Sequence, residues 1–212
     1  YYDLLIDWNN KINLTSIVEY EEVIWKHFLD SAFFVSCDKV DLKEKKKVLD
    51  LGTGAGFPGM VLAILCPDYE FVLADSLNKR IEFLKVVINR LQIHNVSVIH
   101  GRAEELGRDE NFRNQFDYVV SRAVAELPVL LEYCIPFVKK GGYFVSYKSR
   151  RLDEEIENAE NALNMLYTKY EKKYKYELEY DHSERYLVFF RCENITDSKY
   201  PRKPKKIKTN PL

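Results

Sequence analysis

The chain has 212 residues, and its 32 Lys and Arg side chains against 33 Asp and Glu side chains give a formal net charge of -1. This balance argues against a uniformly basic nucleic-acid binder and against an acidic disordered protein. Hydrophobic residues make up 46% of the chain, which excludes intrinsic disorder, and the length suits one large domain or one domain with an appendage.

The four cysteines form no Cys-x-x-Cys pair, and none of the four histidines lies at a ligand spacing from a cysteine. We therefore expect reduced, buried thiols and no metal site. The longest apolar stretches fall far short of the ~20 residues that a membrane-spanning helix needs, and we find no signal peptide. These features predict a cytoplasmic protein without a membrane partner, and a monomer is the default expectation.

The chain opens with two predicted amphipathic helices. In the first, apolar residues from Leu4 to Ile12 fall on one face, and the segment Asn13–Ser16 forms a loop after it. In the second, apolar residues recur at spacings of three and four from Val23 to Phe34. A lysine-rich linker, Lys43–Lys47, then leads into the first strong strand signal.

From Lys47 onward, strand patterns alternate with helix patterns. The predicted strands are Lys47–Leu51, Phe71–Asp75, Val96–Ile99, Phe116–Ser121 and Tyr143–Lys148. The helices predicted between them are Pro58–Leu65, Asn78–Leu91 and Glu126–Tyr133. Alternation at this spacing predicts an α/β fold, in which helices cover both faces of a mostly parallel, twisted sheet.

The last third of the chain continues with a polar helix from Leu152 to about Tyr167. Two strand-like segments, Lys173–Tyr180 and Tyr186–Arg191, are predicted to pair antiparallel at the edge of the sheet. The stretch from Ser198 carries six positive side chains and no acid, so the first 197 residues have a net charge of -7. We expect a helical extension packed on the core (1–42), an α/β domain (43–197) and an extended basic tail (198–212).

The strongest chemical signal is the segment Asp50-Leu-Gly-Thr-Gly-Ala-Gly-Phe-Pro-Gly59, in which a strand ends at an acid and glycines lead into a helix. Glycines let a backbone approach a ligand closely, and the first amides of a helix can donate to ligand oxygens. Residues 54–59 match the dinucleotide fingerprint G-x-G-x-x-G, but Gly52 precedes that match. Asp75 ends the next strand, where an acid can accept hydrogen bonds from two ribose hydroxyls.

Two cofactor classes could use such a ribose-binding acid. A nicotinamide dehydrogenase needs the glycine turn to hold a pyrophosphate. An S-adenosylmethionine enzyme instead uses an acid at the end of the first strand, near a cationic amino-acid group, and has no pyrophosphate to hold. The position of Asp50 favours S-adenosylmethionine over NAD, while a glycine turn without any ligand stays the third interpretation.

Two further clusters follow later strands. In Gly101-Arg-Ala-Glu-Glu105, a backbone amide at Ala103 or Glu104 could contact an adenine ring, although the same acids would suit an ordinary helix start. In Ser121-Arg-Ala123, Arg122 lies at the end of the fourth strand. Since ligands of open α/β sheets bind outside the carboxyl ends of strands, Arg122 is predicted to lie over the ligand crevice, unless it forms a surface ion pair.

Several motifs occur together in this chain: Asn13-Leu-Thr15, His27-Phe-Leu-Asp-Ser31, the glycine segment, Asp75-Ser-Leu-Asn-Lys-Arg80, Gly101-Arg-Ala-Glu104, Ser121-Arg-Ala123 and Tyr200-Pro-Arg-Lys203. With them the chain resembles, over essentially its whole length, the bacterial small-subunit ribosomal RNA guanine-N7 methyltransferases, the RsmG or GidB family. The tail departs from the family, which usually continues with Pro-Gly-x-Pro where this chain has Pro204-Lys-Lys-Ile-Lys-Thr-Asn-Pro211.

The resemblance implies a class I, Rossmann-like methyltransferase that uses S-adenosylmethionine to methylate a guanine N7 in 16S rRNA, with that RNA or the small ribosomal subunit as its partner. It also implies cofactor contacts at Gly52, Phe57, Ala103, Glu104 and Arg122. Adding the residues chosen from the sequence pattern gives the full candidate cofactor site: Asp50, Gly52, Gly54, Gly56, Phe57, Asp75, Ala103, Glu104 and Arg122. Arg122 is also the candidate for positioning the reacting groups.

The chemistry of the implied reaction agrees with the sequence. Guanine N7 has a lone pair and no proton, so its methylation needs placement and electrostatics rather than a general base or a covalent intermediate. An enzyme for an exocyclic amine would have Asn/Asp-Pro-Pro-aromatic where this chain has Ser121-Arg-Ala-Val124. Neither Cys66 nor Cys134 lies where a pyrimidine-C5 enzyme needs its nucleophile. We therefore expect that no catalytic side chain is required.

Basic residues near the carboxyl ends of strands and in the tail are candidate RNA contacts, because phosphate contacts supply most nonspecific affinity. The candidates are Arg102, Lys148, Arg150, Arg151, Arg202 and Lys203, although lysine and arginine are also common in loops. For His27 and Asp30 we expect buried structural hydrogen bonds. Two alternative functions stay open: a methyltransferase for a small molecule, and a cofactor-binding ribosome-assembly factor without essential turnover.

Overall fold

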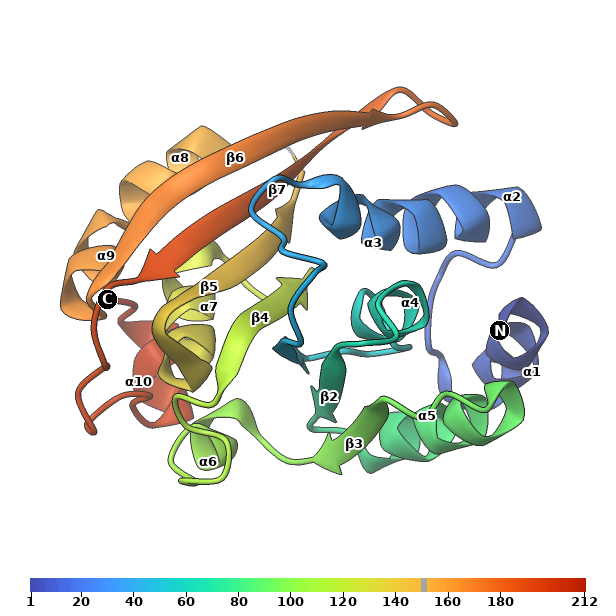
Figure 1. The fold of residues 1–212 in the computed structure, drawn as a ribbon, viewed down its shortest axis with the longest axis horizontal. Coiled ribbons are helices and arrows are strands. Elements are labelled where there is room, and N and C mark those ends of the chain that lie inside the picture. Colours follow the sequence, from blue (N-terminus) through green and yellow to red (C-terminus); the bar gives the residue numbers. More distant parts are fainter. Residues whose placement is uncertain (150–151) are drawn as a thin grey trace.

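The computed structural model describes residues 1–149 and 152–212, and its centre is a twisted sheet (Figure 1). The seven strands are β1 (Lys47–Leu51), β2 (Glu70–Asp75), β3 (Val96–His100), β4 (Phe116–Arg122), β5 (Val138–Lys148), β6 (Thr168–Leu178) and β7 (Ser183–Cys192). Their order is β3-β2-β1-β4-β5-β7-β6, and β7 runs antiparallel to both of its neighbours. The predicted α/β fold with a mostly parallel sheet and an antiparallel edge is confirmed.

The strand order creates a crevice at the carboxyl ends of the central strands. β1 pairs in parallel with β2 on one side and with β4 on the other, so the connections of the chain diverge between β1 and β4. Ligands of open α/β sheets bind in the crevice that such a reversal opens at the carboxyl ends of the strands. The central strands are apolar because both of their faces are buried: Val48 and Val120 belong to one core, and Leu49 and Val119 to the other.

Helices cover both faces of the sheet (Figure 1). On one face, the N-terminal segment packs with α4 and α5 around Leu5, Met60 and Phe83. On the other face, Leu131, Leu163 and Ile207 belong to the second core. The main helices are α1 (Tyr2–Ile12), α4 (Gly59–Leu65), α5 (Asn78–Leu91), α6 (Ala103–Leu106), α7 (Leu127–Cys134), α8 (Leu152–Asn158), α9 (Glu160–Met165) and α10 (Pro204–Thr209). Within the described residues, no helix is both long and apolar enough to cross a membrane.

The second predicted helix is present but changes its hydrogen-bonding pattern along its length. It consists of α2 (Tyr20–Val23), a π-helical segment (Ile24–Leu29), α3 (Asp30–Ala32) and a 3₁₀ turn (Phe33–Ser36). A π-helical turn is wider than an α-helical one and is found mostly at functional sites. Here it lies beside the crevice and contains Lys26 and His27.

The region after β5 differs from the sequence prediction in three places. The single predicted helix is divided into α8 and α9, because the amide of Ala159 bonds to the carbonyl of Ile156, three residues back, and interrupts the α-helical pattern. β6 begins five residues earlier than predicted, at Thr168, and β7 begins three residues earlier, at Ser183. The two strands pair from end to end apart from a register shift between Tyr170 and Lys172. Much of β6 is exposed and polar, so the hydrophobic pattern of the sequence does not indicate where this strand begins.

The C-terminal tail was predicted to be extended, and this prediction is wrong. It ends in α10, and Ile207 of that helix is fully buried in the second core. The Arg113 side chain donates hydrogen bonds to the carbonyls of Thr196 (2.7 Å) and Tyr200 (2.7 Å), which fixes the chain entering the helix. We call residues 198–212 the C-terminal arm, and its treatment as a separate unit stays a prediction.

Candidate active site

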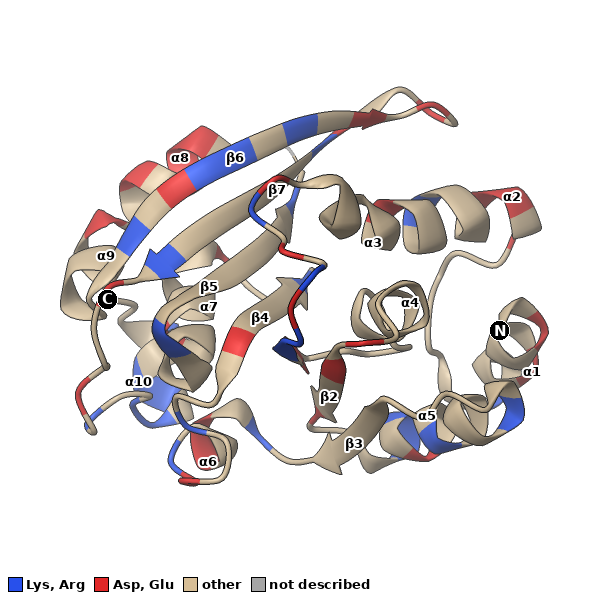
Figure 2. Ribbon diagram, in the orientation of Figure 1, with Lys and Arg blue, Asp and Glu red and all other residues tan. Residues whose placement is uncertain are grey.

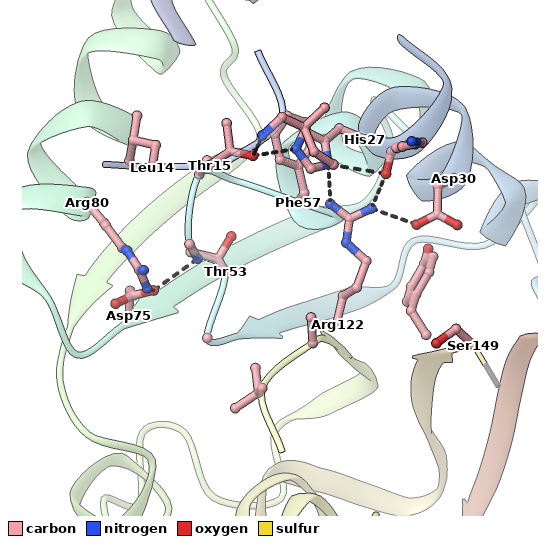
Figure 3. A pocket seen from close by; sticks show the side chains of 18 of the residues that line it. Leu14, Thr15, His27, Asp30, Thr53, Phe57, Asp75, Arg80, Arg122 and Ser149 are labelled. Carbon is pink, nitrogen blue, oxygen red and sulfur yellow. Dashed lines mark hydrogen bonds and ion pairs between the residues drawn. The ribbon is translucent and has the colours of Figure 1, made fainter. Parts of the chain in front are cut away.

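A cavity of about 790 Å³ opens at the carboxyl ends of β1, β2, β4 and β5 (Figure 3). This volume lies in the ~300–1,000 Å³ range of small-molecule sites. Four strand ends, the N-terminal helices, α8 and β7 contribute to its wall: Leu14, Thr15, Ile17, Lys26, His27, Asp30, Gly52, Thr53, Gly54, Ala55, Phe57, Asp75, Ser76, Arg80, Arg122, Ala123, Val124, Tyr147, Lys148, Ser149, Glu155 and Arg185. Of the predicted cofactor residues, Gly52, Gly54, Phe57, Asp75 and Arg122 are thus brought together.

Asp50 shapes the glycine loop from behind the cavity. Its side chain is fully buried, and Oδ2 accepts hydrogen bonds from the Thr53 hydroxyl (2.6 Å) and the Gly59 amide (2.8 Å). A Cβ on Gly59 would lie 2.7 Å from the Cβ of Asp50, so glycine is required by this close approach. Burial raises the pKa of Asp50 to about 6, and Oδ1 accepts no hydrogen bond from any described residue.

The glycine loop then turns its backbone toward the cavity. Gly52 and Gly54 have φ angles of +76° and +60°, a left-handed conformation that side chains disfavour. At Gly54 an added Cβ would meet nothing within 4 Å, so the missing side chain leaves open space beside the loop. A side chain on Gly56 would instead meet Tyr1 and Leu84, and Gly56 does not line the cavity.

Asp75 joins the glycine loop to the end of β2. Its Oδ2 accepts hydrogen bonds from the Gly54 amide (2.9 Å) and from Arg80 Nη1 (3.2 Å), and its Oδ1 accepts one from the Leu77 amide (2.9 Å). The side chain is only 3% exposed but lines the cavity. These donors hold a carboxylate in one orientation at the cavity wall, where it can accept hydrogen bonds from neighbouring hydroxyl groups.

Arg122 occupies the middle of the cavity wall, between the N-terminal helices and the glycine loop (Figure 3). Its Nη1 donates to Asp30 Oδ2 (2.7 Å) and to the carbonyl of Lys26 (3.2 Å), which lies in the π-helical segment. Its guanidinium carbon lies 5.4 Å from the centre of the Phe57 ring. The surface ion pair considered for Arg122 is absent; its ion pair with Asp30 is nearly buried.

His27 completes this group without adding a charge. Its ring stacks on Phe57 with 4.7 Å between centroids, and its Nε2 shares a hydrogen bond with the Thr15 hydroxyl (2.9 Å). Burial and the neighbouring Arg122 charge lower the pKa of His27 to about 4, so the ring is neutral near pH 7. The buried hydrogen bonds expected for His27 and Asp30 are present, and through them both residues meet Arg122.

Several predicted site residues lie away from this cavity. Asp50, Gly56, Ala103 and Glu104 do not line it. Glu104 instead lines a second cavity of about 320 Å³ between α6 and the C-terminal arm, together with Arg102, Glu105, Arg108, Arg202, Lys203 and Pro204. The prediction that a residue at the start of α6 contacts the cofactor therefore finds no support in the cavity lining.

The basic candidates for RNA contact have different environments. Arg202 makes a bidentate ion pair with the fully buried Glu132, at 2.6 Å from Nη2 to Oε2, and so anchors the arm; its contact with RNA stays a prediction. Lys148 lines the main cavity and pairs with Glu155. Arg102 and Lys203 line the second cavity, and Lys203 is exposed. Arg150 and Arg151 lie outside the described residues.

Other reactive groups do not point to a different chemistry. All four cysteines are free and buried, as expected, and burial raises the pKa of the Cys66 thiol to about 11 and that of Cys134 well above its ordinary value. Thiols that stay protonated are poor nucleophiles. Among the described residues, no group of three or more His, Cys, Asp or Glu side chains could hold a metal ion.

The sequence reasoning missed part of the cavity wall. Thr15, Lys26, Asp30, Glu155 and Arg185 all line it, and none was proposed for the cofactor site. Thr15 and Asp30 lie in the motifs Asn13-Leu-Thr15 and His27-Phe-Leu-Asp-Ser31. Membership in these motifs was the one sequence feature that could have pointed to them as site residues. Glu155 and Arg185 stand in polar segments that carry no such motif.

The solved structures that the fold resembles include methyltransferases. A SAM-dependent methyltransferase from Aquifex aeolicus is 18% identical, with a TM-score of 0.58 over 80% of this chain and 92% of that chain. M. jannaschii TYW2, solved in complex with AdoMet, is 17% identical, with a TM-score of 0.54 over 69% of this chain and 68% of that chain. At these identities the likeness establishes the fold, which is that of class I methyltransferases.

Sequence comparisons identify the family. Residues 1–182 match the family model described as rRNA small subunit methyltransferase G. A ribosomal RNA small subunit methyltransferase G from Lachnoclostridium phytofermentans is 53% identical over 202 residues, which cover 95% of this chain and 83% of the relative. The chain therefore belongs to the rRNA small subunit methyltransferase G family, whose members depend on S-adenosylmethionine.

Proposed function

We propose that this protein transfers the methyl group of S-adenosylmethionine to N7 of a guanine in 16S rRNA. The structural observation that carries the proposal is one continuous cavity, with the glycine loop and Asp75 at one side and Arg122 and the ends of β4 and β5 at the other. Family membership supports ribosomal RNA as the substrate class. Family membership does not favour the two alternatives, a methyltransferase for a small molecule and a ribosome-assembly factor without essential turnover.

The residues at the glycine-loop side fit the cofactor. Asp75 is a pre-oriented acceptor for the ribose hydroxyls, and Gly52 and Gly54 let the backbone approach the ligand closely. Phe57 also lines this wall, and its buried ring stacks against His27 and Tyr1. When bound, S-adenosylmethionine supplies an electrophilic methyl group on a positively charged sulfonium.

The charges around the cavity suit a reaction that moves a positive charge from sulfur to a base. The Arg122 charge is balanced by Asp30 at 2.7 Å, and His27 stays neutral, so neither residue opposes the developing cation. Because guanine N7 carries no proton, none of these side chains has to act as a general base. Their contribution is placement of the two reactants and a fixed electrostatic environment.

For RNA binding we propose the rim of the cavity together with the C-terminal arm. Lys203, Lys205, Lys206 and Lys208 are exposed on or next to α10, which carries a cluster of basic residues (Figure 2). Exposed lysines of this kind contact phosphates without reading sequence. We keep the expectation of a monomer that acts in the cytoplasm, on naked 16S rRNA or on the small subunit.

The proposal is tested by incubating the protein with methyl-labelled S-adenosylmethionine and either 16S rRNA or small ribosomal subunits. We expect label in the RNA, and we expect Asp75→Ala to weaken cofactor binding in isothermal titration and to abolish the label. Transfer to small molecules in the absence of RNA would contradict the proposal. So would a protein that binds the cofactor but labels neither RNA substrate.

A further inference from the structure

We propose that Glu155, with Lys148 beside it, reads the Watson–Crick edge of the target guanine and so selects guanine over other bases. The inference rests on the proposed function, because it concerns the base that is methylated in the same cavity. It concerns specificity, whereas the proposed function concerns the reaction itself.

The strand order indicates which part of the cavity receives the base. The cavity extends over the ends of β2, β1, β4 and β5, and neighbouring strands are ~4.8 Å apart, so its width across these strands is roughly 14 Å. The cofactor-binding features, Asp75 and the glycine loop, belong to β2 and β1. The base therefore occupies the part over β4 and β5, which is lined by Val124, Lys148 and Glu155.

Glu155 is fixed in place at that end of the cavity. It projects from α8, and its Oε2 accepts hydrogen bonds from Lys148 Nζ (2.5 Å) and from the Leu127 amide at the start of α7 (3.0 Å). Its side chain is 24% exposed, and its Oε1 accepts no hydrogen bond from any described residue. One carboxylate oxygen thus sets the orientation, and the other, which has no donor among residues 1–149 and 152–212, belongs to a side chain that lines the cavity.

Lys148 supplies a donor next to this acceptor. Its side chain is 9% exposed, and its ammonium group donates to Glu155 and to the carbonyl of Ala125 (3.2 Å). An ammonium group has three donors, so one is left for the cavity. Counting only partners among the described residues, an unpaired carboxylate oxygen and an ammonium group with a donor to spare therefore lie next to each other on the wall over β4 and β5.

This pair complements guanine. The Watson–Crick edge of guanine presents the N1–H and N2–H donors beside the O6 acceptor, which match the carboxylate oxygen and the ammonium donor respectively. Adenine presents an unprotonated N1 to the same carboxylate, which would repel it. N7 lies on the other side of the purine, so a guanine whose N7 faces the cofactor turns its Watson–Crick edge toward the far wall.

The test compares guanosine with inosine, which lacks the N2 amino group, at the methylated position of 16S rRNA. For the wild-type protein we expect inosine to lower kcat/KM by about 10- to 100-fold, the discrimination typical of a paired base edge. For Glu155→Gln we expect a similar loss on guanosine, and little further loss on inosine. The matched control is Glu157→Gln, an exposed acid on the same helix, which should behave as wild type on both substrates.

Each outcome decides the inference. If inosine and guanosine are methylated equally well by the wild-type protein, the base is not read at N2, whatever the variant does. If replacing guanosine by inosine lowers kcat/KM by the same factor in the wild-type protein and in Glu155→Gln, Glu155 does not contact the N2 amino group. A loss of activity in the variant is then a structural effect. A wild-type protein that methylates no guanine refutes the proposed function itself.

Discussion

The ion pair between Arg122 and Asp30 allows a quantitative test of how the N-terminal helices build the site. The change Asp30→Ala removes the acceptor of Arg122 Nη1 at 2.7 Å and the acceptor of the Tyr176 hydroxyl at 2.7 Å. The Arg122 side chain is 15% exposed and keeps the Lys26 carbonyl as an acceptor. Removing one partner of a buried ion pair lowers the free energy of unfolding by about 3–5 kcal/mol. Because Arg122 keeps the Lys26 carbonyl as an acceptor, we expect Asp30→Ala to lower it by about 3 kcal/mol.

The loss is measured as the change in the free energy of unfolding by urea, extrapolated to water. The control Asp38→Ala removes an acid whose side chain is 65% exposed, and its loss should stay below about 1 kcal/mol. The double variant Asp30→Ala with Arg122→Met removes both charges and should recover part of the stability. If the free energy of unfolding of Asp30→Ala stays within about 1 kcal/mol of the wild-type value, the ion pair does not hold the N-terminal helices to the sheet.

Three further predictions follow from single contacts. Glu132→Ala should release the C-terminal arm by removing the fully buried partner of Arg202, so amide exchange in residues 198–212 should become much faster while the central strands stay protected. Because the pKa of His27 is about 4 in the folded protein and near 6.5 when exposed, stability should fall by up to about 3 kcal/mol as the pH drops from 6.5 to 4. In a urea titration at several pH values, His27→Gln should lose this part of the pH dependence. Gly59→Ala should force its Cβ, at 2.7 Å, against Asp50 and displace the loop, and an unchanged cofactor affinity in isothermal titration would contradict that geometry.

The parts of the fold and site that depend on local pattern were predicted correctly from the sequence. The strand ends at Asp75 and Arg122 could be located because hydrophobic runs stop there, and the crevice rule for α/β sheets then placed both residues at the main cavity, which they line. The same rule correctly placed the glycine loop. It could not show that Asp50 lies behind the cavity wall, because that depends on the hydrogen bonds that Asp50 accepts from Thr53 and Gly59.

The parts that were missed depend on contacts between distant segments. Asp30 meets Arg122 across 92 positions of the chain, and Tyr176 meets Asp30 across 146. The helix in the C-terminal arm was missed because Ile207 stands alone among lysines, so no hydrophobic pattern indicates that it is buried. The ion pair of Arg202 with Glu132 was missed for the same reason, because only the fold brings the two residues together.

The proposed transfer of a methyl group to guanine N7 can be tested directly, by mapping the position of that group in the RNA. Methylation at N7 places a positive charge on the imidazole ring of guanine, so borohydride reduces that ring and the glycosidic bond then hydrolyses. Aniline cleaves the RNA chain at the abasic site, and primer extension locates the break. We predict one new stop at a guanine of 16S rRNA that has been incubated with the protein and S-adenosylmethionine, and none with Asp75→Ala. Label found on an adenine, a pyrimidine or a ribose, with no break at any guanine, would contradict the claim.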